Sequence, residues 1–199
     1  MKRAAWVALP LMLTSSSFCA AEEPILGGPC ENCELVFEGQ PEQISERARI
    51  APLEERGEPL ILEGMVQMSD GSPASGIVVY AYHTDDSGHY PRSTTRHGRL
   101  RGWARTDRTG MYRFDTIRPR HYPNGIEPAH IHMHVIEPGK GTYWIDDVLF
   151  DDDELLTDAI RKRFLFRGGS GVTHPVQGDD GVWRVRRDII LGENVPGYE

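Results

Sequence analysis

A short segment in the middle of the chain alternates strictly between histidine and apolar side chains. Within residues 129–136, His130, His132 and His134 occupy every second position, and the residues between them are apolar. Side chains of a β-strand point alternately to the two faces of a sheet, so this pattern predicts a strand with one apolar face and one histidine face. Three histidines on one face of a strand are not expected to lie in a hydrophobic core. The segment therefore predicts a sheet that buries one face and carries polar chemistry on the other.

Other alternating runs surround this segment and are separated by turn residues. Short strands with frequent Gly, Pro and Asp turns are typical of an antiparallel sandwich. These runs cover residues 60–68, 77–83, 102–106, 111–116, 143–150 and 182–191. Helices are expected only at residues 41–48 and 154–164. The predicted fold class is all-β, an antiparallel β-sandwich with short helices and long loops.

The first 21 residues have the order of a secretory signal peptide. Lys2 and Arg3 precede an apolar stretch, which ends in small residues up to Ala21 and is followed by two acids. The apolar stretch is about half as long as a membrane span, so no span is expected. We expect cleavage near Ala21 and export to the periplasm or the extracellular space. Lipid attachment at Cys19 is the alternative.

After this leader, the sequence divides into a polar arm and one domain. Residues 22–59 are rich in Glu and Pro and are interpreted as an N-terminal arm, and residues 60–199 as the sandwich domain. The net charge of the chain is −8, which argues against nucleic acid as a partner. Cys30 and Cys33 are expected to form a disulfide in an oxidising compartment, and a thioredoxin-like redox role is the alternative. The sequence predicts no particular oligomeric state.

The tripeptide His-Tyr-Pro occurs twice and adds two tyrosines to the histidine strand. Tyr90 and Tyr122 each precede a proline, which favours extended or loop geometry. His130 and His132 point to the same side of a strand, with Cα atoms about 6.5–7 Å apart, so their imidazoles can converge on one metal. A phenol binds a metal at neutral pH only when a highly charged ion displaces its proton. Hard oxygen and imidazole ligands suit Fe(3+), and two tyrosinates with a hydroxide would compensate its charge.

A longer pattern surrounds these four residues between about residue 60 and residue 155. It consists of Gly64, Val66, Asp70, Gly71, Pro73, Gly88, Tyr90, Gly102, Thr106, Asp107, Gly110, Tyr112, Phe114, Thr116, Pro119, Tyr122, Pro123, Pro128, Ala129, His130 and His132. This pattern resembles the intradiol ring-cleavage dioxygenases, the family of catechol and protocatechuate dioxygenases. The resemblance implies that the four ligands hold a ferric ion, with Tyr122 leaving when substrate binds. It also implies cleavage of a catechol-type ring by O2 to a muconate-type dicarboxylate.

Two positions depart from the family pattern. Glu127 occupies a position where family members usually have arginine, and Asp147 occupies that of an expected glutamine. Both place an acid beside a site for an anionic substrate, so Glu127 and Asp147 join Tyr122 as candidate catalytic residues. A basic loop is the expected source of compensating charge, which would favour a carboxylated catechol, or else it is simply solvated. It contains Arg92, Arg96, Arg99, Arg101 and Arg105.

Two other functions are compatible with the sequence. The first is a catalytically weak or inactive transthyretin-like binding module of the cell envelope. The second is a zinc or copper site built on His130, His132 and His134 without the tyrosines. In the iron-site interpretation, His134 lies one repeat beyond the ligands and is expected behind them or facing solvent.

Overall fold

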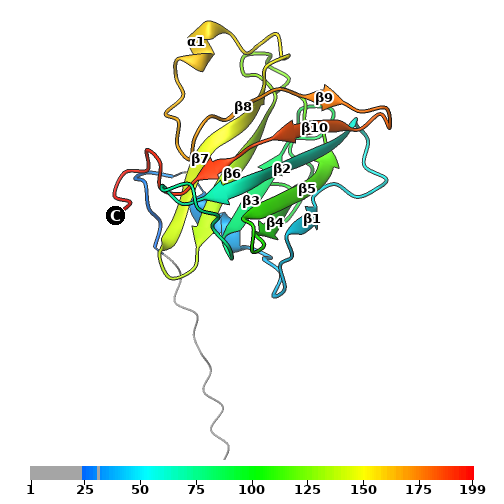
Figure 1. Cartoon of the computed structure of the whole chain (residues 1–199). Coiled ribbons are helices and arrows are strands. Elements are labelled where there is room, and N and C mark those ends of the chain that lie inside the picture. Colours follow the sequence, from blue (N-terminus) through cyan, green and yellow to red (C-terminus); the bar gives the residue numbers. More distant parts are fainter. Residues whose placement is uncertain (1–23, 31) are drawn as a thin grey trace, which may run out of the picture.

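The computed structural model describes residues 24–30 and 32–199. The expected leader and Cys19 lie outside these residues. The described chain is nearly all β, which confirms the predicted fold class (Figure 1). Its helices are the 3-10 helix η1 (Cys33–Phe37) and the short α1 (Asp158–Arg161). No helix within the described ranges combines the length and the apolar character needed to cross a membrane.

The strands of the described chain form two packed sheets. The first, which we call the histidine sheet, has the order β4-β3-β6-β7-β8. Its strands are β3 (Val78–His83), β4 (Arg101–Arg105), β6 (His130–Glu137), β7 (Gly141–Phe150) and β8 (Val172–Thr173). The second, which we call the arginine sheet, has the order β1-β5-β2-β10-β9, with β11 also paired to β2. Its strands are β1 (Arg47–Arg49), β2 (Pro59–Gln67), β5 (Met111–Ile117), β9 (Val176–Gln177), β10 (Trp183–Arg186) and β11 (Ile189–Ile190).

The hydrophobic core lies between the two sheets. Ile131, Met133 and Val135 of β6 are almost completely buried and pack in one cluster with Leu62 of β2 and Phe114 of β5. The predicted apolar face of residues 129–136 is thus the inner face of the sandwich. The histidines necessarily lie on the outer face, because side chains alternate along the strand.

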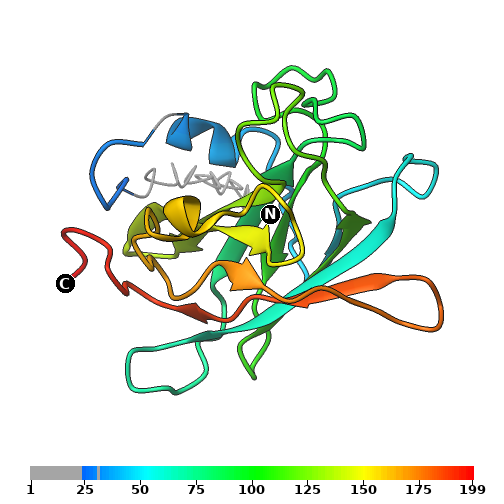
Figure 2. The same cartoon turned by 90° about the horizontal axis from the view of Figure 1, so that it is seen from above.

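The N-terminal segment covers part of that outer face. Leu26 donates its N–H to the Thr142 carbonyl at 2.8 Å, and Trp103 Nε1 donates to the Val36 carbonyl at 2.7 Å. Val36 also packs against Tyr80 in a small second cluster. Helix η1 therefore lies on the side of the histidine sheet that faces away from β2 and β10 (Figure 2).

Several local predictions were wrong. Residues 41–48 form no helix, because their end becomes edge strand β1, which pairs in parallel with β5. Of residues 154–164 only α1 is helical, since Thr157 caps a single turn and so short a helix gains little from its own hydrogen bonds. The run 182–191 splits into β10 and β11. The sheets are mixed, not purely antiparallel, because β1, β8, β10 and β11 pair in parallel.

Candidate functional site

Two loops at one end of the histidine sheet hold the predicted tyrosine ligands. Tyr90 lies in the loop 84–100 between β3 and β4, and Tyr122 lies in the loop 118–129 between β5 and β6. Thr84 Oγ1 donates to the Arg120 carbonyl at 2.7 Å and joins the loops. Gly88 has φ +80°, and a Cβ there would lie 2.2 Å from the His121 carbonyl oxygen. Glycine is therefore required where the loops cross, and this close approach brings the two tyrosines together.

The four predicted ligands meet as a closed ring of donor atoms. Tyr90 Oη lies 2.7 Å from Tyr122 Oη, which lies 3.2 Å from His130 Nε2. His130 Nε2 lies 3.2 Å from His132 Nε2, which lies 2.9 Å from Tyr90 Oη. The structure thus brings together all four residues that the sequence singled out.

The far sides of both imidazoles are occupied. His130 Nδ1 lies 2.8 Å from the Pro128 carbonyl oxygen, and His132 Nδ1 lies 3.1 Å from Asp147 Oδ1. Each Nδ1 therefore carries the hydrogen and donates it outward, which leaves each Nε2 lone pair directed at the tyrosine oxygens. This arrangement selects the tautomer that a metal requires.

An irregularity in the strand pairing places Asp147 behind His132. Ile131 pairs with Val148 but Met133 pairs with Ile145, so β7 has one residue more than β6 at this point. Such a bulge redirects side chains and is common beside functional sites. Ligand atoms of His130, His132 and Asp147 lie within 4.8 Å of one another. Asp147 nevertheless contacts the nitrogen that faces away from the other ligands, so its position is that of a residue that fixes the His132 ring and not of a fifth ligand.

Burial controls the protonation of the site. Burial raises the pKa of Tyr90, and its hydrogen bond with Tyr122 raises it further, while burial also raises the pKa of Tyr122. Burial and then the nearby His132 lower the pKa of His130. Burial likewise lowers the pKa of His132, but the Asp147 carboxylate outweighs this effect and leaves the pKa raised. Both phenols therefore keep their protons at neutral pH unless a cation displaces them.

The donor set fits a ferric ion. Ligands that each lie about 2 Å from one ion lie about 3 Å from their neighbours, as the four donor atoms do. Two phenol oxygens and two imidazoles form a hard, partly anionic set that suits Fe(III) better than it suits soft metals. His134 is not part of this ring, because its Nδ1 lies 3.6 Å from Cys33 Sγ.

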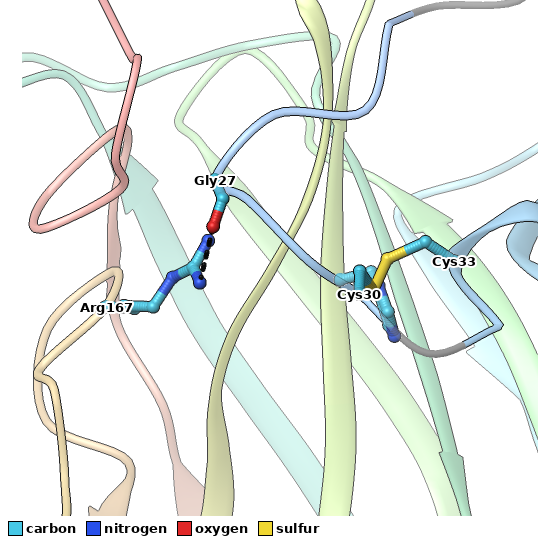
Figure 3. Close-up of a disulfide and its surroundings, with 5 residues drawn as sticks. Gly27, Cys30, Cys33 and Arg167 are labelled. Atoms are coloured by element: carbon cyan, nitrogen blue, oxygen red, sulfur yellow. Dashed lines mark hydrogen bonds between the residues drawn. A yellow bond between two sulfur atoms is a disulfide. The ribbon is translucent and has the colours of Figure 1, made fainter.

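A cavity of about 730 Å³ opens onto the four ligands. Ile160, Phe164 and Leu165 supply an apolar part of its wall, and Pro29 and Cys30 of the N-terminal segment supply another part. That segment is held by the Cys30–Cys33 disulfide, as expected from the sequence, and by a 3.2 Å hydrogen bond from Arg167 to the Gly27 carbonyl (Figure 3). The cavity volume is in the range of small-molecule sites.

The acids and arginines predicted around the site have different positions. Glu127 lines the cavity and is exposed. Arg96 lines the cavity as well, whereas Arg99 pairs with Glu55 away from the ligands. Arg101 lies over the Trp103 ring, and Arg105 donates to the Gly76 carbonyl. Among the loop arginines, the structure therefore brings Arg96 to the cavity.

Sequence reasoning missed an aromatic stack beside the ligands. The ring of Tyr82 lies 4.6 Å from that of His132 and 3.9 Å from that of His97. The alternation in residues 77–83 places Tyr80 and Tyr82 on the histidine face, so this signal was present for the tyrosines. No periodic signal marked His97, which lies in the loop 84–100 and is buried.

Comparison with known proteins identifies related sequences and structures. A family model described as Dioxygenase matches residues 36–168. The chain is 30% identical to hydroxyquinol 1,2-dioxygenase of Nocardioides simplex over 166 residues, which cover 68% of this chain and 55% of that protein. It is 29% identical to the protocatechuate 3,4-dioxygenase beta chain of Burkholderia cepacia, covering 50% of this chain and 48% of that protein.

A solved structure shows the same fold. Catechol 1,2 dioxygenase of Acinetobacter radioresistens superimposes with a TM-score of 0.63 at 21% identity, covering 90% of this chain and 65% of that chain. The chain spans about half the length of the two curated relatives described above. The family model covers most of the chain, including both tyrosines, both histidines and the loops that hold them. The protein therefore belongs to the intradiol ring-cleaving dioxygenase family.

Proposed function

We propose that the protein is a non-haem Fe(III)-dependent intradiol dioxygenase that cleaves a catechol-type ring with O2 to a muconate-type dicarboxylate. The observation that carries the proposal is the closed ring of four donor atoms from Tyr90, Tyr122, His130 and His132 at the base of a cavity. A ferric ion bound by these atoms would supply the Lewis acidity that makes the phenols ionise and that activates a bound catecholate ring toward O2.

The tyrosines have different proposed tasks. Both tyrosines would hold the ion, and Tyr122 is the one that would accept a proton from a catechol hydroxyl when substrate binds. Tyr90 stays in place, and its ring is held beside those of Tyr82 and His132. His130 and His132 keep their Nε2 atoms directed at the metal through their outward hydrogen bonds. The protein thereby holds the reacting groups in a fixed geometry.

The two acids have separate proposed roles. Asp147 is a positioning residue, because it contacts His132 and not the space where substrate would bind. Glu127 lines the cavity, and its charge adds an unfavourable field for an anionic substrate. The alternative of a histidine-only zinc or copper site is not favoured, since His134 faces Cys33 while both tyrosine oxygens contact the histidine nitrogens.

We also propose that the protein is exported. Residues 1–21 are proposed to be a leader, so that the domain works outside the cytoplasm on a small catechol-type molecule and O2. An exported enzyme would meet such aromatic molecules before uptake. Comparison of the mass of the protein taken from the envelope or medium with that of the full chain tests cleavage near Ala21.

Metal analysis with a visible spectrum tests the central proposal. Purified protein is expected to hold about one ferric iron per chain and to show a tyrosinate-to-iron charge-transfer band. Tyr90→Phe and Tyr122→Phe should each weaken or shift that band, and native protein should consume O2 when catechol is added. A band that persists in both variants contradicts the ligand assignment. Iron-loaded protein that leaves catechols intact contradicts the enzymatic proposal.

A further inference from the structure

Three metal-binding side chains meet outside the ring of four donor atoms. Cys30 and Cys33 belong to the N-terminal segment, and His134 belongs to β6 of the histidine sheet. The ligand atoms of these three side chains lie within 4.8 Å of one another. The proposed ring cleavage uses none of them, so the cluster has no role in the site described above.

The spacing of sulfur and nitrogen matches a zinc site. Cys33 Sγ lies 3.6 Å from His134 Nδ1. Zinc binds thiolate sulfur at about 2.3 Å and imidazole nitrogen at about 2.0 Å, so at the tetrahedral angle the two ligand atoms are about 3.5 Å apart. Cys-x-x-Cys is also a common spacing of zinc ligands. Cys33 and His134 therefore already have the separation that one zinc ion requires.

His134 presents its Nδ1 to the cysteines in a fixed orientation. The residue is 4% exposed, and its ring lies beside those of Tyr80 and Tyr82, with centroid separations of 5.9 and 6.1 Å. A disulfide sulfur has no hydrogen to donate and accepts only weakly, so its contact satisfies Nδ1 poorly. Buried polar atoms of native proteins are nearly all well paired. A zinc ion held by the cysteine sulfurs would give this nitrogen a strong partner.

The cysteine pair has room to open toward the cavity. Asn32, between the two cysteines, has φ +62°, a left-handed conformation that asparagine tolerates and that reverses the chain. The Cα atoms of Cys30 and Cys33 are 5.6 Å apart, and their sulfurs face one another (Figure 3). Cys33 is completely buried, whereas Cys30 is half-buried and lines the cavity together with His134. After reduction, the Cys30 sulfur can separate from Cys33 on this side, and the cavity has space for water as a fourth ligand.

We propose that reduced Cys30 and Cys33 bind one Zn²⁺ together with His134, in a site separate from the four donor atoms of the proposed iron site. Opening the disulfide takes two electrons and two protons from a dithiol reductant, which itself becomes a disulfide. Zinc then displaces the two thiol protons and binds both thiolates. Thiolate with imidazole suits zinc, whereas phenolate with imidazole suits ferric iron. The zinc site does not depend on the proposed function.

The oxidised and zinc-bound states hold the N-terminal segment differently. The disulfide joins two residues of the segment across a four-residue loop, so it does not tie the segment to the sheet. Zinc bound to His134 joins the segment to β6 at the wall of the cavity. Because a ligand that binds only the folded protein stabilises it, zinc should raise the urea midpoint of reduced protein more than that of oxidised protein.

The zinc content of reduced and oxidised protein tests the proposal. Purified protein with Cys19→Ser, which removes the third cysteine of the chain, is reduced with a phosphine under argon or left oxidised. Both samples are equilibrated with the same zinc buffer, and the difference in bound zinc is measured. Zinc at the four donor atoms does not require the thiols and cancels in this difference. One additional zinc per chain is expected after reduction, and equal zinc contents would overturn the proposal.

Three variants identify the ligands. Loss of a ligand should cost at least as much affinity as loss of an outer partner, so Cys30→Ser and His134→Asn should each weaken zinc binding by reduced protein about a hundredfold. His174→Gln is the control and should leave the affinity unchanged, because His174 is exposed and pairs with Asp151. Additional zinc that persists in Cys30→Ser would place the ion elsewhere, and persistence in His134→Asn would leave it on the cysteines alone. Either result overturns the site. Cys30→Ser remains informative even if His134→Asn folds poorly.

Cobalt gives a spectroscopic test of the same ligands. Co²⁺ adopts the tetrahedral geometry of zinc, and a bound thiolate adds a charge-transfer band in the near ultraviolet. The difference spectrum of reduced native protein with Co²⁺ should show this band, and Cys33→Ser should weaken it. A merely structural role of the cysteines would not produce the band. Bound Co²⁺ without the band would overturn thiolate coordination, whereas absence of iron from the purified protein would overturn only the proposed function.

Discussion

The histidine sheet and the arginine sheet share one core but have opposite outer faces. On the arginine sheet the outer face carries ion pairs such as Arg47 with Asp115 and Arg186 with Asp188, whose arginine side chains are more than half exposed. On the histidine sheet the corresponding positions of β3 and β6 carry tyrosines and histidines, and the ring of Tyr82 stacks on those of His132 and His134. The strands of both sheets alternate between apolar and polar residues, so this alternation alone does not distinguish the two outer faces.

The difference lies in what covers the outer face. Exposed ion pairs are screened by water and contribute little, so such a face tolerates change. A covered face excludes water, and there each polar atom needs a specific partner. Chemistry that depends on shifted protonation is therefore expected on the covered sheet, and the following predictions test this contrast.

Removal of a ligand should have the largest effect. His130→Ala should lower the iron content below about one tenth of the native value and abolish ring cleavage, because three donors hold the ion less tightly than four. Arg113→Ala on the arginine sheet is the control, and it should keep the iron and change the free energy of unfolding by less than about 1 kcal/mol. Metal analysis and urea denaturation measure both. Equal iron loss in the two variants would contradict the contrast between the faces.

Acid should destabilise the fold through a histidine that is buried between the two sheets. His83 is completely buried, with Nε2 at 2.7 Å from Thr116 Oγ1 of the other sheet, and burial lowers its pKa to about 4. The unfolded chain has a histidine pKa near 6.5, so it takes up a proton between pH 6.5 and pH 4 that the folded protein does not. The free energy of unfolding should therefore fall with falling pH, by about 3 kcal/mol from this residue by pH 4.

Urea denaturation at several pH values tests the effect of acid. His83→Gln should be less stable than native protein at pH 7 but should lose less stability on acidification. His174→Gln is the control, because His174 is exposed, and it should keep the native slope. A His83→Gln slope equal to the native one would show that the acid sensitivity lies elsewhere.

Loss of the carboxylate behind His132 should weaken metal binding without abolishing it. Asp147→Asn keeps the shape of the side chain but removes its charge, and changes of this kind typically cost ten- to a hundredfold in metal affinity. Competition with a chelator measures the affinity. Asp152→Asn, which changes an exposed carboxylate that pairs with Arg118, should have no effect. Unchanged affinity in Asp147→Asn would leave the carboxylate without the positioning role.

Neutralisation of the acid at the cavity should help turnover modestly. Glu127→Gln should raise kcat/KM for catechol about fivefold, because a water-screened charge a few ångströms from an anionic substrate costs about 1 kcal/mol. Glu154→Gln is the control, since this exposed acid lies outside the cavity. O2 uptake at matched iron content measures the effect. Slower turnover in Glu127→Gln would mean that the carboxylate takes part in the reaction.

Loss of the disulfide should have the smallest effect. Cys30→Ser with Cys33→Ser should lower the free energy of unfolding by about 1 kcal/mol, because a four-residue loop restricts the unfolded chain little. Iron content should not change, since neither sulfur contacts the four ligands. Urea denaturation and metal analysis measure these values. Mass spectrometry that finds two free thiols in native protein would contradict the disulfide itself.

The sequence predicted the parts of this molecule that depend on local patterns. Alternation in β6 predicted the strand, its buried face and the pair His130 and His132, and the two prolines predicted that Tyr90 and Tyr122 lie in loops. The crossing of those loops at Gly88 was not predicted, because it depends on residues more than 30 positions apart. Only the structure shows that the predicted donors converge.

The remaining features depend on pairings that leave no periodic trace. Strands β8, β9 and β11 have two residues each, too few to show a pattern. The contact of Asp147 with His132 depends on one additional residue in β7, and a shift by one residue reverses the facing of every side chain beyond it. His97 owes its burial to a loop conformation that its neighbours in sequence do not specify.

The pairing of β2 has a consequence for how the chain reaches this fold. Strands β10 and β11 lie beside β2 although more than 110 residues separate them from it in sequence. A Cβ on Gly64 would lie 1.8 Å from the Arg187 carbonyl oxygen. Until residues 183–190 have been synthesised, β2 presents an unpaired edge, and such edges pair readily with other chains. Chains that stall or are clipped before β10 should therefore aggregate, although the four donor residues and both of their loops are already complete.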